Sequence, residues 1–530
     1  MFLNSKTFEM KKNLYNIVFI TVMAVILNSC SKKYDQYFSD TNRPESVPPA
    51  LVLNSVLVDM TEGVWNQTQL WNQFHARNYA YYGNQEYNWT GATLNYTTLK
   101  NVIKMEEEAK KGGAQDLNPY AALGKFFRAY FFYSMTNKVG DLPLKEALQS
   151  LENQTPKYDT QKEIFVQILK WLEDANNDLS QLINAADVSL LGDFYFNNDL
   201  RKWQKTVNTF KLRVLISLSK KEADADLSIK TRFAEIMANK TKYPVMEGMA
   251  DNLQYTYNNA FNRYSTNPDN FGFDAERYNM SATYLNTLVN LKDPRVFVVA
   301  EPAGKKVASG ISPTDHAAFV GARSDEDLTD MAAKAGGGEY SFIGRKKYYS
   351  TYTAEPGIQI GYIEMCFNIA EAIHRGWITG NAEDWYKKGI MASIGFYGIV
   401  NGANTVNFQK AGQSLGNYNA YTINVDLDAY YNQSAVKYAG ANATGLNQIL
   451  IQKYLAFFQN SGWEAYYNYR RTGVPAFAQG GPGTGNSGSI PKRFQYPRSE
   501  LTTNEANLNE ALKRQFGGTD NINAAMWLIQ

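Results

Sequence analysis

Apolar side chains recur at helical spacing through much of the chain. Behind Thr160 they lie three or four residues apart, at Ile164, Ile168, Leu172, Ala175, Leu179 and Leu182. That spacing gives a helix one continuous apolar face. The segment Thr160-Gln161-Lys162-Glu163 in front of it has the pattern of a capping box. We therefore predict an amphipathic helix that begins at this box and packs its apolar face on a core.

Similar patterns predict further helices. Asn118-Pro119 places a capping residue before a proline at the first helical position. Residues 361–377 and 382–396 predict two helices joined by a turn at Gly376 to Gly380. Small residues in one helix and large residues in the other favour a helix hairpin of the tetratricopeptide type, although no strict 34-residue period is present. The expected fold class is mainly α.

Long stretches without helical period separate these helices. They cover residues 251–280, 301–353 and 476–489, and they are rich in Asn, Tyr, Phe or Gly. Long loops in a compact domain are usually functional or disordered. We expect a helical scaffold that carries loop-rich insertions for ligand binding.

The first 48 residues have the pattern of an export signal and a tether. An apolar run from Ile17 to Leu27 follows Lys11 and Lys12 and is too short for a transmembrane helix. The run ends in Asn28-Ser29-Cys30, which resembles a bacterial lipobox. We predict a lipoprotein signal peptide at residues 1–29, lipidation of Cys30, a polar tether at residues 30–48 and a helical domain at residues 49–530. The alternatives are an ordinary cleaved signal with a chance cysteine, and a true start at Met10.

Charge balance narrows the class of partner. The chain has 53 Lys and Arg against 51 Asp and Glu, and removal of the leader leaves 50 of each. Nucleic-acid binding needs a basic surplus, so we expect no nucleic-acid partner. The 36 Tyr outnumber the 28 Phe, which favours many half-exposed rings.

Cysteine and histidine are scarce. The chain has two Cys and three His, and none of them has metal-ligand spacing. We expect no metal site and no cofactor. Cys366 lies in an apolar helical stretch and is expected to be a buried thiol.

A series of short motifs, taken in order, resembles one known family. The motifs are Asp40-Thr41-Asn42-Arg43-Pro44, Arg128-Ala129-Tyr130, Gly140-Asp141-Leu142-Pro143, Asp293-Pro294-Arg295, Ala370-Glu371-Ala372, Trp463-Glu464-Ala465, Arg470-Arg471-Thr472-Gly473 and Ile490-Pro491-Lys492-Arg493. Behind a lipobox, this set is similar to the SusD/RagB family of outer-membrane lipoproteins, and most similar to its second SusD-like branch.

The resemblance implies a fold, a place in the cell and a function. Members are helical lipoproteins with tetratricopeptide repeats, anchored in the outer membrane and facing the cell exterior. They sit as a lid on a SusC-like TonB-dependent transporter, capture oligosaccharides or sometimes peptides, and are not enzymes. Their repeat-bearing face generally meets the transporter, and ligand binds a surface built by loops. Arg470 and Arg471 are expected to be structural and to pair with carboxylates and carbonyls.

Ligand residues vary within such a family, so we predict them from chemistry. Sugars present apolar C–H faces and hydroxyl groups, which suit exposed aromatic rings beside amide or guanidinium groups. The densest segment of this kind is Trp65 to Trp89, where we expect a helix between Trp71 and Asn78 and a loop from Tyr81 to Trp89. A second candidate segment is Asn262 to Tyr278. The candidate ligand residues are Trp89, Tyr82, Tyr81, Arg77, Asn84, Trp71, Tyr264 and Tyr278.

Other interpretations remain open. At least half of the rings Trp65, Trp71 and Phe74 are expected in the core. The bound nutrient could be a peptide instead of a glycan. A surface glycosidase would need two carboxylates about 5–10 Å apart, which the sequence does not identify. A structural lid that binds nothing tightly is the last alternative.

Overall fold

The computed structural model describes residues 46–530. The predicted signal peptide, Cys30 and almost all of the predicted tether lie outside the described residues. None of the helices in the described part is long and apolar enough to cross a membrane.

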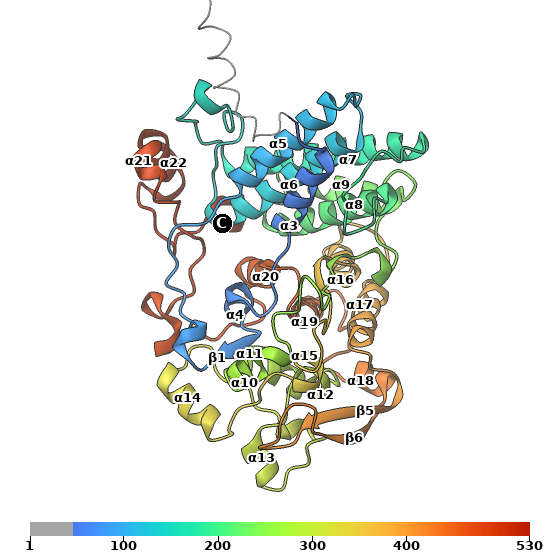
Figure 1. Cartoon of the computed structure of the whole chain (residues 1–530), viewed down its shortest axis with the longest axis vertical. Helices are drawn as coiled ribbons and strands as arrows, with labels where there is room; N and C mark the ends of the chain where they lie inside the picture. Colours follow the sequence, from blue (N-terminus) through green and yellow to red (C-terminus); the bar gives the residue numbers. More distant parts are fainter. Residues whose placement is uncertain (1–45) are drawn as a thin grey trace, which may run out of the picture. The chain divides into compact units, whose positions relative to one another are not determined.

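Helices of the first half pack into one layered group. Figure 1 shows this group at the end of the domain opposite the hairpin of β5 (Gly402–Gln409) and β6 (Tyr418–Val425). The helices of the group are α3 (Pro49–Asp59), α5 (Tyr96–Lys111), α6 (Pro119–Val139), α7 (Gln161–Asn184), α8 (Leu200–Ser217) and α9 (Ile229–Ala238). Successive helices α5 to α8 pack side by side, and α3 packs on α5. Their shared core includes Phe126, Leu172, Trp203 and Phe210, each fully buried.

Predicted helix starts agree with the structure. Asn118 caps α6 by accepting a hydrogen bond from Ala121 N, and Pro119 is the first helical residue. Thr160 and Glu163 form the capping box of α7. These caps satisfy backbone N–H groups that have no partner inside a helix. The caps and the apolar period together explain why both helices could be predicted.

A second helical group carries the hairpin predicted after Gly361. It comprises α16 (Tyr362–His374), α17 (Ala382–Phe396), α19 (Ala443–Ala456) and α20 (Glu464–Thr472). Helices α16 and α17 are neighbours that pack on each other, and α16 also packs on α8 and α19. A side chain at Gly389 would clash with the Phe367 ring, so this glycine permits the close approach of the two helices. Cys366 is buried on α16, and burial raises the pKa of its thiol to about 12.

Shorter elements fill the segments between these groups. The helices are α4 (Gln67–Trp71), α10 (Phe271–Asp274), α11 (Ala282–Asn290), α12 (Val296–Val299), α13 (Gly304–Ala308), α14 (Leu328–Gly336), α15 (Arg345–Tyr348), α18 (Leu427–Asn432), α21 (Glu500–Thr503) and α22 (Glu505–Phe516). Three antiparallel strand pairs join β1 (His75–Arg77) to β3 (Tyr278–Met280), β2 (Leu253–Tyr255) to β4 (Gly357–Ile360), and β5 (Gly402–Gln409) to β6 (Tyr418–Val425).

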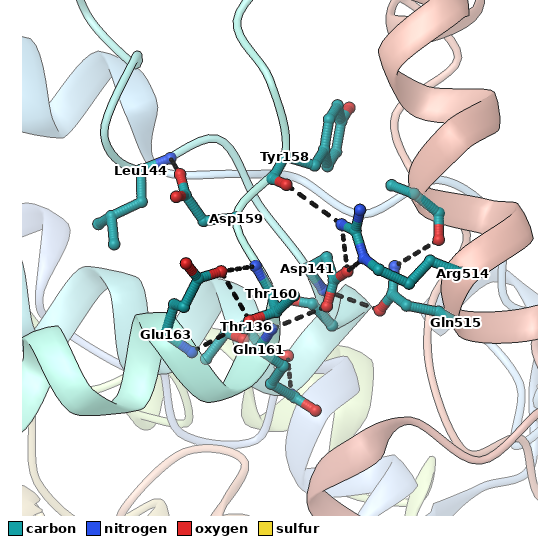
Figure 2. A network of polar contacts seen from close by, with 12 residues as sticks. Thr136, Asp141, Leu144, Tyr158, Asp159, Thr160, Gln161, Glu163, Arg514 and Gln515 are labelled. Carbon is teal, nitrogen blue, oxygen red and sulfur yellow. Dashed lines mark hydrogen bonds and ion pairs between the residues drawn. The ribbon is translucent and has the colours of Figure 1, made fainter. Parts of the chain in front are cut away.

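The C-terminal segment is fastened to the turn between α6 and α7 by a polar network (Figure 2). Asp141 accepts hydrogen bonds from Arg514 Nη2 (2.6 Å) and from Gln161 N (2.8 Å). Arg514 also donates to the carbonyl of Tyr158, and Gln515 accepts from Asp141 N. Because Asp141 is buried, these bonds compensate the loss of water around its carboxylate and hold α22 against the helical layer.

One buried ion pair connects the two helical groups, and a second lies within the second group. Arg213 of α8 contacts the carboxylate of Glu364 on α16, and Arg471 of α20 contacts that of Glu371. Arg470 donates to the carbonyls of Asn137 and Lys492. The expectation that Arg470 and Arg471 are structural is thereby confirmed.

Candidate functional site

Strand pairing joins the two segments that the sequence suggested as separate candidates. In the β1–β3 pair, Arg77 lies opposite Tyr278 and His75 lies opposite Met280. The loop that follows β1 therefore lies beside the α10 segment that precedes β3. The two candidate segments build one surface.

An exposed aromatic cluster lies at this junction. Tyr79 is 51% exposed and Tyr81 is 82% exposed, and Tyr82 is half-buried between them and the fold. The rings of Tyr81 and Tyr82 lie 5.2 Å apart, and those of Tyr79 and Tyr81 lie 6.4 Å apart. The exposed guanidinium of Arg277 lies 5.0 Å from the Tyr79 ring. Phe273, 74% exposed, accepts a hydrogen bond at its carbonyl from the Tyr82 hydroxyl.

We call these five residues, Tyr79, Tyr81, Tyr82, Phe273 and Arg277, the tyrosine patch. They present aromatic faces beside one cation, and Arg277 makes no ion pair with any of the described residues. Aromatic faces suit the apolar C–H face of a pyranose ring, and a guanidinium suits hydroxyl or carboxylate oxygens. The arrangement can bind a hydroxylated ligand.

The turn that carries the tyrosines is held from behind by Arg77. Its guanidinium donates to the carbonyls of Trp65 (2.6 Å) and Tyr82. Gly83 has φ +101°, and a Cβ there would lie 2.9 Å from Arg77 Nη1. Arg77 is only 8% exposed, so it positions the tyrosine turn and does not offer its charge to solvent.

Two other predicted residues also support this turn. Asn84 is half-buried and accepts a hydrogen bond at its carbonyl from Gln67 Nε2, while its side-chain oxygen accepts from Glu86 N. Tyr278 is 8% exposed and lies beneath Arg77 and Tyr82. Its ring centroid lies 5.4 Å from Arg77 Cζ and 6.1 Å from the ring centroid of Tyr82. Both residues lie next to the tyrosine patch, below its surface.

Three predicted aromatic residues lie in or against the core. Trp89 is 4% exposed and its ring stacks on Phe494 with centroids 4.1 Å apart. Tyr264 is fully buried, where its hydroxyl accepts a hydrogen bond from Trp65 Nε1. Trp71 is half-buried and donates through Nε1 to the carbonyl of Glu86. The expectation that Trp89 and Tyr264 offer open ring faces was wrong, because neighbouring rings already cover them.

The prediction of a helix between Trp71 and Asn78 was also wrong. Helix α4 ends at Trp71, Gln73 adopts φ +56°, and the chain then enters β1. The backbone of this segment finds its hydrogen-bond partners in β3, which an isolated sequence pattern cannot reveal. Sequence reasoning also missed Arg277 and Phe273, since the register of two three-residue strands decides their place.

A buried carboxylate lies behind the tyrosine patch. Asp274 accepts a hydrogen bond from the Tyr349 hydroxyl (2.5 Å), and burial raises the pKa of its carboxyl to about 6. The ordinary value is 3.8. Because the pKa of Asp274 is higher in the folded state than in the unfolded chain, the ionised form costs folding free energy. That cost is absent below pH 3.8, grows as the pH rises through 6, and is constant above.

We expect Asp274→Asn to stabilise the protein at pH 8 by about 1 kcal/mol, because the amide keeps the acceptor for Tyr349 without the charge. At pH 3.5 the variant and the wild type should unfold at the same denaturant concentration. The measurement is the urea midpoint at both values of pH. An equal difference at both would show that the carboxylate charge is not the cause.

Metal binding finds no support in the described part of the chain. Within residues 46–530, no three His, Cys, Asp or Glu side chains lie in an arrangement that could hold a metal ion. The buried His75 has a pKa lowered well below its usual value by burial and by the nearby Arg77 charge. It therefore lies neutral behind the tyrosine patch.

Residues 41–497 match the family profile SusD-like_2, described as starch-binding and associating with the outer membrane. Comparison with the curated proteins found no match.

Several solved structures are similar to this chain. A SusD homolog of Bacteroides fragilis is 31% identical with a TM-score of 0.79, and the match covers 91% of this chain and 100% of that one. A second SusD homolog of the same organism is 30% identical with a TM-score of 0.74, over 92% and 100% of the two chains. A chitin-binding SusD homolog from Flavobacterium johnsoniae shares the fold at 20% identity, over 91% and 98%, with a TM-score of 0.65.

These similarities confirm the mainly α fold that the motifs predicted. The match to the family profile spans most of the chain, and two similar structures are at least 30% identical over their whole length. The chain belongs to the SusD-like family of outer-membrane-associated nutrient-binding proteins.

Proposed function

We propose that this protein is a non-catalytic glycan-binding lipoprotein that captures oligosaccharides at the tyrosine patch and delivers them to a SusC-like TonB-dependent transporter. The observation that carries the proposal is the exposure of Tyr79 and Tyr81 beside Arg277. Large rings with open faces are uncommon in a fold whose other aromatic side chains are mostly packed together. The proposal includes a lipid on Cys30 and a location on the outside of the outer membrane.

Rigid support of the tyrosine turn favours binding without large rearrangement. Arg77, Gly83 and Gln85 fix the turn by hydrogen bonds, since Gln85 Oε1 accepts from Arg77 N and Gln85 Nε2 donates to Arg77 O. A preformed surface loses little conformational entropy when ligand binds. The chitin-binding relative from Flavobacterium johnsoniae adds support for a glycan as the ligand class.

The test is affinity electrophoresis of the soluble protein, from Ser31 onward, in native gels cast with a panel of polysaccharides. We expect one glycan to retard the wild type without release of reducing ends. Tyr81→Ala should weaken that binding about 10-fold, because one ring–sugar contact contributes about 1.5 kcal/mol. Since Tyr81 is 82% exposed, the variant should unfold at the same temperature as the wild type.

The matched control is Phe194→Ala. Phe194 is 42% exposed in the loop after α7, next to α3, and lies on other elements than the tyrosine patch. Retardation that is lost equally in both variants would place the glycan elsewhere. Release of reducing ends would favour the glycosidase alternative. No retardation by any glycan would favour the peptide ligand or the structural lid.

A further inference from the structure

A groove of about 550 Å³ lies on elements that the tyrosine patch does not use. It runs between strand β6, the start of α12 and helix α18, and Figure 1 shows these elements at the end of the domain opposite α5 to α9. Its lining includes Lys292, Phe297, His316, Asn424 and Ala429. The volume lies in the usual range of small-ligand sites.

One wall of the groove is the outer edge of a β-sheet. Strand β6 pairs with β5 only, and residues 422–426 line the groove. The backbone N–H and C=O groups of residues 422–425 form backbone hydrogen bonds with β5 and with no other described segment. An edge strand with unpaired N–H and C=O groups is a template for a further strand. The groove therefore contains backbone groups that can recognise an extended peptide.

The opposite wall is aromatic. The rings of Phe297 and His316 lie 4.7 Å apart in edge-to-face contact, and His316 is held by a contact between Nε2 and the carbonyl of Asp293 (3.3 Å). Ile423 and Val425 on β6 are each 8% exposed and alternate with the exposed Thr422 and Asn424. This alternation suits an added strand whose apolar side chains point to the same side as Ile423 and Val425.

One lysine and one aspartate, Lys292 and Asp426, line the groove, so it carries one charge of each sign. Lys292 is exposed and has no ion-pair partner in residues 46–530. The nearby carboxylate of Asp426 already accepts a hydrogen bond from Ala429 N (2.8 Å) as the cap of α18. The carboxylate of Asp293 is occupied by Arg295 and by the Tyr430 hydroxyl. The ammonium of Lys292 thus complements a carboxylate at one place in the groove, while Asp426 keeps its negative charge at the end of β6.

We propose that this groove is a second ligand site, which binds a short extended oligopeptide as an added strand along β6. Its free carboxylate lies at Lys292 and an apolar side chain lies against Phe297. Five groove-lining residues of β6 and its end correspond to about 17 Å of strand, so the peptide has about five residues. The site does not depend on the proposed glycan function, because it shares no residue with the tyrosine patch.

The experiment measures binding of N-acetylated, valine-rich pentapeptides by fluorescence anisotropy, with a glutamate and a free carboxylate at the C-terminus. We expect the wild type to bind and Ala429→Trp to lose binding at least 10-fold, since Ala429 is exposed and lines the groove. Lys292→Gln should lose about 5-fold, and so should the wild type with a C-terminally amidated peptide. Lys240→Gln, an exposed lysine on another element, is the matched control and should bind as the wild type does.

Hydrogen exchange provides a second readout. Peptide should slow the exchange of backbone amides within residues 418–426, because an added strand accepts hydrogen bonds from the open edge. Glycan retardation should be unchanged in Ala429→Trp, which separates this site from the tyrosine patch. The proposal is overturned if no such peptide binds, if Ala429→Trp binds as the wild type does, or if exchange at β6 does not change.

Discussion

Replacement of Glu371 by alanine is expected to lower the free energy of unfolding by about 3–5 kcal/mol. The carboxylate of Glu371 is completely buried on α16 and contacts two guanidinium groups, those of Arg471 and Arg375. Arg471 is only 5% exposed in its side chain. Loss of the carboxylate would leave this cation buried without a counter-charge.

The direction of the pKa shift of Glu371 determines how the effect of Glu371→Ala changes with pH. Burial alone would raise the pKa of Glu371, but the Arg471 and Arg375 charges hold it far below the usual 4.5. The folded-state pKa is therefore depressed. The stability that this group contributes is present above pH 4.5 and declines as the pH falls toward the folded value. Glu371→Ala should be destabilised strongly at pH 7 and much less at pH 2.

Urea unfolding followed by tryptophan fluorescence is the measurement. Glu510→Ala is the matched control, because Glu510 is exposed on α22. It should unfold at the midpoint of the wild type. If Glu371→Ala also keeps that midpoint, the ion pair does not contribute to stability and the connection between α16 and α20 must rest on apolar packing.

Sequence patterns predicted the scaffold because the information for helices is local. The capping residues Asn118 and Thr160 and the apolar period behind Thr160 act within a few turns of the chain. The motif residue Arg471 was expected to be structural and to pair with a carboxylate, and it forms a buried ion pair with Glu371 between α20 and α16. The capping residues and the apolar period that define a helix all lie within about 20 consecutive residues of sequence.

The candidate site could be predicted only in part, because it depends on contacts between distant segments. The segment with Tyr81 and Tyr82 was identified by its density of aromatic and amide side chains. Arg277 was missed, since only the pairing of β1 with β3 brings it to Tyr79. A list of aromatic residues also does not show which rings are covered. Trp89 and Tyr81 look equivalent in sequence, yet they are 4% and 82% exposed.

Replacement of Trp89 by alanine is expected to lower the free energy of unfolding by about 3–5 kcal/mol, as for other buried tryptophans. The ring stacks on Phe494 and contacts Tyr466 and Trp463 at centroid distances of 5.0 and 5.5 Å. It thereby joins the loop after β1 to α20 and to the chain near residue 494. Deletion would leave a cavity at the junction of three segments that are far apart in sequence.

The matched comparison is Tyr81→Ala, which removes an aromatic ring of similar size from an exposed position. Thermal unfolding should separate the two variants clearly, with a lower midpoint for Trp89→Ala and an unchanged midpoint for Tyr81→Ala. Glycan retardation, measured well below both midpoints, should show the opposite pattern. Tyr81→Ala should weaken it and Trp89→Ala should leave it unchanged, because only Tyr81 offers a free ring face. If Trp89→Ala kept its midpoint and lost glycan binding, Trp89 would be a ligand residue and its ring would not be packed on Phe494.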